Sequence, residues 1–391
     1  MNTAGAWFRT LTILAIALPS PALAQFRTDA PSPPALGIGV DTLPSAAWGT
    51  PWKGPVPAIY RRWAEFLASK APRYTAPGAV PSPFWSAVEQ QKWITFPLAL
   101  SMAGTEGASP TVLDIRPATP GSDTAYVVKT LFQSPDYGHG VQPLALVRVY
   151  AVREHGTWVF SNALPRTTRD WQRRTVGPFD YVFPPGYRFD SARAARAATF
   201  ADSVATAFAV PKVSHVEYYL TESPDEMNRI VGLDWLPSST DGGAFSSGFN
   251  HLLVSGNPAV GENYRHEIVH VVLSPMSLSG IHPLLWEGLA TWLGGTLGMD
   301  ALAVRTAYAQ FLRAHTEVTL DAILTESVDL GFRPAGAVLC QMVFERGGVS
   351  ALKTLIASGR TDADLKAGLQ HVLGKPWSDI QTEWRRGALM Q

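Results

Sequence analysis

The chain has 391 residues, of which 46% are hydrophobic and 16% charged, proportions typical of a folded protein with two or three domains. Its 32 basic and 32 acidic side chains give a formal net charge of zero, and neither sign forms a long run. This balance argues against a nucleic acid or an anionic membrane as the partner, because both attract a basic surface.

Residues 1–24 have the pattern of a secretory signal peptide. Arg9 supplies a positive charge, residues 11–18 form a short apolar run, and Ala22 and Ala24 fit a small-residue cleavage site. The run is too short to cross a bilayer, which requires about 20 apolar residues. We therefore expect a protein exported to the periplasm or the extracellular space after cleavage near Ala24, with no transmembrane helix in its mature form. An uncleaved anchor is the alternative.

Residues 25–56 are rich in Pro, Ala and Gly, which indicates an extended segment. Residues 57–174 are predicted to form an α+β domain of unknown role, built on an antiparallel sheet. Apolar spacing and composition predict its elements: helices over 57–69 and 84–93, strands over 124–132, 144–152 and 157–163, and a turn at 154–156. We find no catalytic constellation in this part of the sequence.

Residues 175–391 are predicted to form a second α+β domain, with a small mixed sheet followed by a mostly helical C-terminal part. Ser223 and Glu226 have the spacing of a capping box at the start of a helix. That helix is expected over 224–231. The other elements expected before residue 261 are a strand and a connection within 175–189, a helix over 192–209 and strands at 216–220 and 251–255. The single cysteine, Cys340, excludes an internal disulfide and lies in an apolar stretch, where a thiol packs as a small hydrophobe.

The residues that point to metal binding and catalysis are His266-Glu267-Ile268-Val269-His270. Residues four apart lie on the same face of a helix, so both imidazoles can reach one metal ion. Zinc suits imidazole ligands and takes three protein ligands in catalytic sites. Glu267 points off the line of the two histidines, where it can take a proton from a water activated by the metal. The alternative is a buried helix with two ordinary histidines, although buried polar groups need partners and a metal would provide them.

Glu287 is the candidate for the third ligand. It is a lone carboxylate on an otherwise apolar helix, where burial is costly unless the group is paired or binds a metal. Between it and His270 lie Pro275, Gly280 and Pro283, which allow the chain to reverse. The alternative is a carboxylate that interacts with the helix dipole.

Together, residues 266–270 and Trp286-Glu287-Gly288-Leu289-Ala290 resemble the gluzincin metallopeptidases, particularly the peptidase MA-like family, and the resemblance covers about residues 176–388. It implies a zincin-like domain in which His266, His270 and Glu287 bind one Zn²⁺ and Glu267 is the general base. It also implies that the strand at 251–255 lies near the edge of the cleft and binds an extended substrate.

The sequence departs from this family at two places. Many gluzincins have an Asp four residues after the Glu ligand to orient a histidine, and here that residue is Thr291. Many also use a Tyr or His to stabilise the oxyanion. The candidates for that role here are Arg333, His282 and Tyr264.

These observations favour an exported zinc metallopeptidase that acts on a peptide or protein substrate. The alternative is a catalytically inactive, zinc-stabilised binding module, which the two departures favour and the intact Glu267 opposes. A zinc hydrolase that acts on a non-peptide amide is the third possibility.

Overall fold

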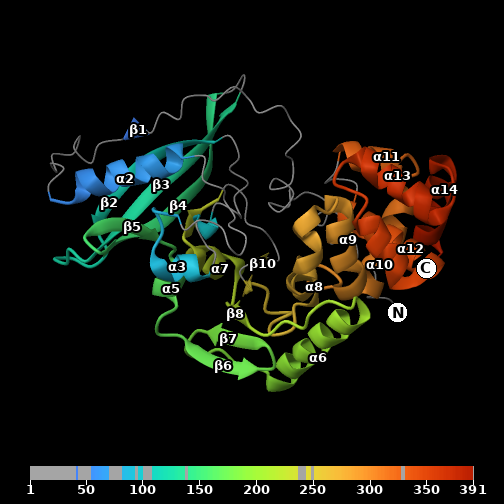
Figure 1. Cartoon of the computed structure of the whole chain (residues 1–391), viewed down its shortest axis with the longest axis horizontal. Helices are drawn as coiled ribbons and strands as arrows, with labels where there is room; N and C mark the ends of the chain where they lie inside the picture. The colour runs from blue at the N-terminus through green and yellow to red at the C-terminus, as the bar shows by residue number, and fades with distance from the viewer. Residues whose placement is uncertain are drawn as a thin grey trace, which may run out of the picture.

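The computed structural model describes residues 41–42, 54–69, 82–92, 96–99, 108–136, 140–236, 244–247, 251–326 and 331–390. The expected signal peptide and nearly all of the Pro/Ala-rich segment lie outside these residues. The described part contains two β-sheets, with the C-terminal helices gathered on one side of the molecule (Figure 1). The predicted α+β class, with an antiparallel sheet first and a mostly helical C-terminal part, is confirmed.

The first sheet has the strand order β1-β2-β3-β4-β5, and β9 pairs with β4 outside this path. Its strands are β1 (Asp41–Thr42), β2 (Ser109–Pro117), β3 (Ala125–Asp136), β4 (Gly140–Glu154), β5 (Thr157–Ser161) and β9 (Leu233–Trp235). Strands β2 to β5 are antiparallel, and three of them were predicted. β2 was not predicted, because its two prolines and its bulge between Val112 and Asp114 disturb the alternation that marks a strand.

Short helices accompany the first sheet: α2 (Val56–Ala68), α3 (Ala87–Gln91) and α5 (Leu164–Thr167). In α2, Ile59 and Trp63 lie one turn apart and are completely buried. The indole of Trp63 donates to the hydroxyl of Thr130 on β3 at 2.8 Å, so its polar atom is satisfied inside the core. This contact fixes α2 on one face of the sheet (Figure 1).

The second sheet has the order β10-β11-β8-β7-β6. Its strands are β6 (Gln172–Val176), β7 (Phe179–Phe183), β8 (Val216–Leu220), β10 (Ala244–Ser247) and β11 (Leu252–Ser255). The inner pairs β7–β8 and β8–β11 are parallel, and the outer pairs are antiparallel, so this is the mixed sheet that was predicted. Residues 251–255 were expected near the edge of the cleft; in the sheet, β11 pairs with β8 on one side and with β10 on the other, so β10 is the end strand among the described strands.

The helices of the second part are α6 (Ser191–Ala207), α7 (Pro224–Val231), α8 (Arg265–Leu273), α9 (Pro283–Gly294), α10 (Ala301–Ala314), α11 (Leu320–Glu326), α12 (Phe332–Ile356), α13 (Asp362–Leu373) and α14 (Trp377–Leu389). Helix α12 is interrupted by non-helical backbone at Gly347 and Gly348. A 3₁₀ segment, η2 (Ser274–Ser279), follows α8. Among the described helices, none is both long and apolar enough to span a membrane.

The second sheet is buried on both faces. Tyr218 belongs to the hydrophobic core shared with α6, α8, α9 and α12, whereas the next residue, Tyr219, belongs to the core of the first sheet. Alternation along a strand sends successive side chains to opposite faces, which explains this division. The expected domain boundary near residue 174 lies within β6. The core of the first sheet includes residues on both sides of it, such as Val128 and Val254, and β9 joins the first sheet from beyond it.

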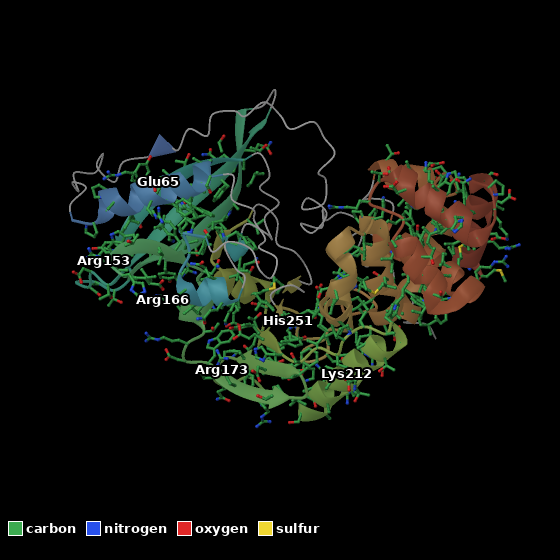
Figure 2. All side chains as sticks on the ribbon, in the orientation of Figure 1. Glu65, Arg153, Arg166, Arg173, Lys212 and His251 are labelled. Atoms are coloured by element: carbon green, nitrogen blue, oxygen red, sulfur yellow. The ribbon has the colours of Figure 1, made fainter. Side chains whose placement is uncertain are left out.

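Charged side chains are distributed along the described surface. Figure 2 shows Arg153, Arg166 and Arg173 at successive places on β4, α5 and β6, and Lys212 beyond the end of α6. Some charges join the two parts of the chain: Lys92, just after α3, lies 2.6 Å from Glu217 on β8.

Candidate metal centre

The second sheet positions the segment that leads into α8. The hydroxyl of Tyr218 on β8 donates to the carbonyl of Gly261 at 2.6 Å and accepts from the backbone N–H of Tyr264 at 3.2 Å. The hydroxyl of Tyr181 on β7 donates to the carbonyl of Glu262 at 2.9 Å. Two buried tyrosines therefore hold the residues immediately before His266.

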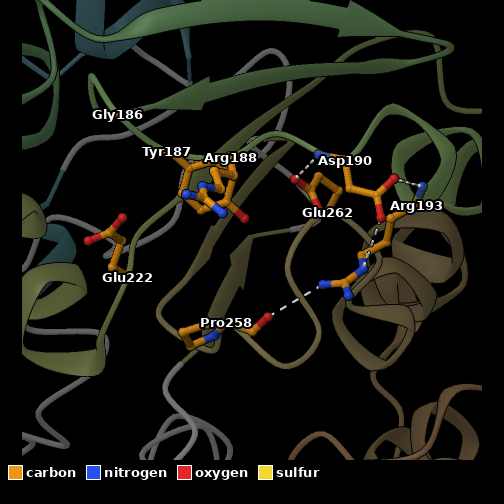
Figure 3. Close-up of a pocket in the computed structure, with 8 residues that line it drawn as sticks. All are labelled: Gly186, Tyr187, Arg188, Asp190, Arg193, Glu222, Pro258 and Glu262. Carbon is orange, nitrogen blue, oxygen red and sulfur yellow. Dashed lines mark hydrogen bonds and ion pairs between the residues drawn. The ribbon is translucent and has the colours of Figure 1, made fainter.

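The side chain of Glu262 adds a third attachment, shown in Figure 3. This carboxylate is 1% exposed and accepts from the backbone N–H of Asp190 at 2.8 Å. Asp190 in turn caps α6 by accepting from the N–H of Arg193. The start of α6 and the start of α8 are thus tied together, in a surface pocket of about 500 Å³ that also contains Tyr187 and Arg188.

Helix α8 presents His266 and His270 one turn apart, and both are buried, at 1% and 7% exposure. After η2 the chain reverses at Gly280, which has a φ of 84°, and α9 returns beside α8. This reversal, expected from the prolines and glycine between the two segments, brings Glu287 to the histidines. Its Oε2 lies 3.3 Å from Nε2 of His266, and its Oε1 lies 3.6 Å from Nε2 of His270.

The three side chains offer one donor atom each, and these atoms lie within 4.8 Å of one another. Nδ1 of His266 lies 2.8 Å from the carbonyl oxygen of Gly295, which can only accept, so Nδ1 carries the proton and Nε2 keeps its lone pair. Within the described residues this buried Nε2 has no hydrogen-bond partner. Two imidazoles and one carboxylate, with one imidazole held in the tautomer that binds metal, fit a zinc ion.

Residue 291 is Thr, so it does not orient a histidine in the way that the expected Asp would. In this structure the backbone carbonyl of Gly295 orients His266 instead. Gly294 allows this approach, because a Cβ there would lie 2.6 Å from the backbone of Arg265 and His266. Thr291 is 1% exposed, and its hydroxyl has no hydrogen-bond partner among the described residues.

Arg333 lies on the other side of Glu287. Its Nε donates to Oε2 of Glu287 at 2.8 Å, and its Nη1 donates to the hydroxyl of Thr296 at 3.4 Å. Burial opposes ionisation of Glu287, but the neighbouring Arg333 charge outweighs it and holds the pKa of Glu287 well below its ordinary value. The third candidate ligand is therefore an anion at neutral pH.

Two glycines bring Arg333 to this position. Helices α9 and α12 cross where Gly288 faces Gly336, and a Cβ on Gly336 would lie 2.1 Å from the carbonyl oxygen of Leu284. Arg333 is one turn before Gly336, and Glu287 immediately precedes Gly288. Neither the glycine contact nor the pairing of Arg333 with Glu287 was predicted. The two glycines on apolar helices were the available signal, because such residues permit close helix contact.

Trp286 covers one side of the site. Its ring centroid lies 4.7 Å from that of His270, with the two planes inclined at 31°. An aromatic wall excludes water from this side of the imidazole and strengthens electrostatic interactions behind it.

Glu267 is half-buried, and its charge acts on Tyr264. Burial, followed by the charge of Glu267, raises the pKa of Tyr264, so this phenol keeps its proton at neutral pH. Tyr264 therefore lies within electrostatic reach of the candidate base, as Arg333 does.

His282, the remaining candidate, has both ring nitrogens engaged elsewhere. Nδ1 accepts from the backbone N–H of Leu284 at 3.1 Å and so caps α9, and Nε2 lies 3.0 Å from Asp362 of α13. The structure thus brings together His266, His270, Glu287 and Arg333, with Glu267 and Tyr264 beside them, and places His282 at a helix start.

No protein-family model matches this chain, and no curated protein matches it. Similar solved structures include a two-domain M1 zinc metallopeptidase bound to L-tryptophan, at 12% identity and a TM-score of 0.34, over 71% of this chain and 63% of that one. The M1 zinc metallopeptidase from Deinococcus radiodurans is also similar, at 13% identity and a TM-score of 0.32, over 73% of this chain and 65% of that one. This chain thus spans less than two thirds of the length of either structure.

Proposed function

We propose that this chain is a zinc-dependent metallopeptidase in which His266, His270 and Glu287 hold one Zn²⁺ and Glu267 is the general base. The observation that carries the proposal is the convergence of three buried donor atoms within 4.8 Å, one of them an imidazole nitrogen whose lone pair is left free by the Gly295 carbonyl. Glu267 supports catalysis over a purely structural site, because a structural metal needs no half-buried carboxylate next to a ligand.

A zinc ion in this position supplies a Lewis acid that makes water reactive near neutral pH. Glu267 accepts the proton from the attacking water and passes it to the leaving amine. Tyr264 keeps its proton and can donate a hydrogen bond as negative charge develops on the substrate oxygen. Arg333 holds the carboxylate of Glu287 in place and adds positive charge to the same region.

The second sheet offers a place for an extended peptide. Among the strands that the structure describes, β10 ends the strand order, and it contacts α8, so no described strand pairs with its outer edge. We assign the substrate-binding edge to β10, where the resemblance suggested residues 251–255. A peptide or protein substrate and export by residues 1–24 remain parts of this proposal.

The test combines metal analysis of the purified protein with cleavage of a peptide library, with and without a chelator. We expect one equivalent of zinc and cleavage that the chelator abolishes and added zinc restores. Glu267→Gln should keep the zinc and lose at least about 100-fold in kcat, because general-base catalysis is worth about 10² to 10⁴. The control is Glu65→Gln on α2 (Figure 2), which changes an exposed carboxylate and should leave cleavage unchanged.

Two results would reject the proposal. One equivalent of zinc without chelator-sensitive cleavage would favour the zinc-stabilised binding module, whose supporting observation is the unpartnered Thr291 hydroxyl in place of the family's Asp. Full activity of Glu267→Gln would reject the assigned general base.

A further inference from the structure

A tight turn follows α9 beside the metal centre. Thr296 and Met299 exchange two backbone hydrogen bonds, of 3.0 Å and 2.9 Å, across a two-residue turn. Its central residues, Leu297 and Gly298, have φ of 52° and 83°. Two positive φ values define a type I′ turn, for which Asn-Gly and Asp-Gly are the favoured sequences.

This turn is attached to the site by two consecutive residues. The carbonyl of Gly295 orients His266, and the hydroxyl of Thr296 accepts from Arg333. Leu297 is the next residue along the chain, so its backbone lies directly beside two contacts of the candidate metal centre.

Leucine is an unexpected residue at this position. In the left-handed region its Cβ crowds the backbone, whereas Gly avoids this cost and Asn tolerates it better. Leu297 is also 40% exposed, which is high for a large apolar residue, so only part of it is buried to offset the strain. Unfavourable backbone conformations of this kind cluster at functional sites.

We propose that Leu297 is a specificity-determining residue whose side chain contacts an apolar side chain of the substrate next to the metal centre. This inference rests on the proposed peptidase function and adds a preference for apolar residues beside the scissile bond. Substrate binding would bury the exposed part of Leu297 and so recover the apolar contact that the fold leaves open.

A second turn in the chain provides the matched control. His155 and Gly156 connect β4 and β5 with φ of 49° and 81°, the same conformation as Leu297 and Gly298, at the first sheet. Leu297→Asn and His155→Asn should both relieve strain and raise Tm by about 1–3 °C. Only Leu297→Asn should alter selectivity.

Selectivity is measured in two ways. The first is the ratio of kcat/KM for peptides that differ only in Leu or Ala next to the cleaved bond. The second, which needs no hydrolysis, is the ratio of Kd values of zinc-loaded protein for a leucine-derived and a glycine-derived hydroxamate. In the wild type both ratios should favour leucine. Leu297→Asn should reduce each by about tenfold, the size of effect that a small change in a hydrophobic pocket produces.

The measurements distinguish failure of the proposed peptidase function from failure of the proposed role of Leu297. Wild-type protein that cleaves no peptide, but whose hydroxamate preference is lost in Leu297→Asn, would reject the peptidase function and keep Leu297 as an apolar contact. Three results would overturn the role of Leu297: hydroxamate ratios unchanged within twofold, an equal loss in His155→Asn, or no binding of either hydroxamate to the zinc-loaded wild type.

Discussion

Nε of Arg333 donates a 2.8 Å hydrogen bond to Oε2 of Glu287, the same oxygen that lies 3.3 Å from Nε2 of His266. One carboxylate oxygen thus faces a permanent cation on one side and a candidate zinc ligand on the other. Without a metal, Arg333 is the only permanent positive charge that the described structure places against this buried anion. With zinc bound, the anion would have a second compensating charge.

Arg333→Met should therefore destabilise the metal-free protein more than the zinc-loaded protein. Removal of one partner of a buried pair costs about 3–5 kcal/mol, and the 27% exposure of the Arg333 side chain reduces our expectation to about 1–3 kcal/mol. Urea unfolding with a chelator and with saturating zinc measures both costs. Arg169→Met, which removes an exposed arginine, is the control. An equal cost in the two states would mean that Arg333 acts through packing alone.

The contact of Gly288 with Gly336 makes a second prediction. Gly336→Ala would place a Cβ 2.1 Å from the carbonyl oxygen of Leu284, so α9 and α12 must separate. Overpacking of this kind costs about 1–3 kcal/mol, and the shift should also weaken zinc binding because Glu287 moves with α9. Thermal unfolding and zinc titration measure the two effects.

Gly387→Ala is the control for that substitution. Its Cβ would meet only a methyl group of Val338 at 3.8 Å, and replacing glycine by alanine within a helix stabilises it by about 1 kcal/mol. The prediction for Gly336 fails if both alanine variants are equally stable.

Some contacts of the candidate metal centre can be recognised in the sequence, and others cannot. The spacing of His266 and His270 and the isolation of Glu287 on an apolar helix are side-chain patterns, so they could be found without coordinates. The carbonyl of Gly295 and the crossing at Gly336 are backbone contacts between distant segments, and no local pattern reports them.

The two sheets show the same difference between local sequence patterns and contacts of distant segments. Alternation predicted β3, β4 and β5, but it could not reveal that β11 lies inside its sheet. Strand order depends on pairing partners, which periodicity does not contain. The candidate metal ligands could therefore be predicted from side-chain patterns, whereas the backbone contacts around them could not.

Thr291 offers a prediction about stability. Its hydroxyl is buried without a hydrogen-bond partner in the described structure, a situation that costs about 1–3 kcal/mol. Thr291→Val replaces the hydroxyl by a methyl group of similar size and should raise the free energy of unfolding by about 1 kcal/mol. The contrast is Thr167→Val, because the Thr167 hydroxyl donates to the carbonyl of Ile230 at 2.9 Å and its loss should destabilise. Loss of stability in Thr291→Val would indicate that this hydroxyl has a partner such as a bound water.

The stability of the protein should depend on pH through His282. Burial lowers the pKa of His282 below its ordinary value of 6.5, although its hydrogen bond to Asp362 opposes the shift. The unfolded chain therefore binds a proton at a pH where the folded protein does not. The stability that depends on neutral His282 is complete above about pH 6.5 and is lost as the pH falls from there through the lower folded-state pKa, by at most about 1.4 kcal/mol per pH unit.

Protonation also removes the acceptor that caps α9, because Nδ1 then carries a hydrogen and cannot accept from Leu284. His282→Asn keeps an acceptor at this helix start, since Asn is a favoured N-cap residue, but it does not titrate. We expect the variant to lose this part of the decline in unfolding free energy below pH 6.5, measured in urea with a chelator present. His371→Asn, at an exposed position, should keep the wild-type pH profile. If His282→Asn declines as steeply as the wild type, His282 is not the group that titrates.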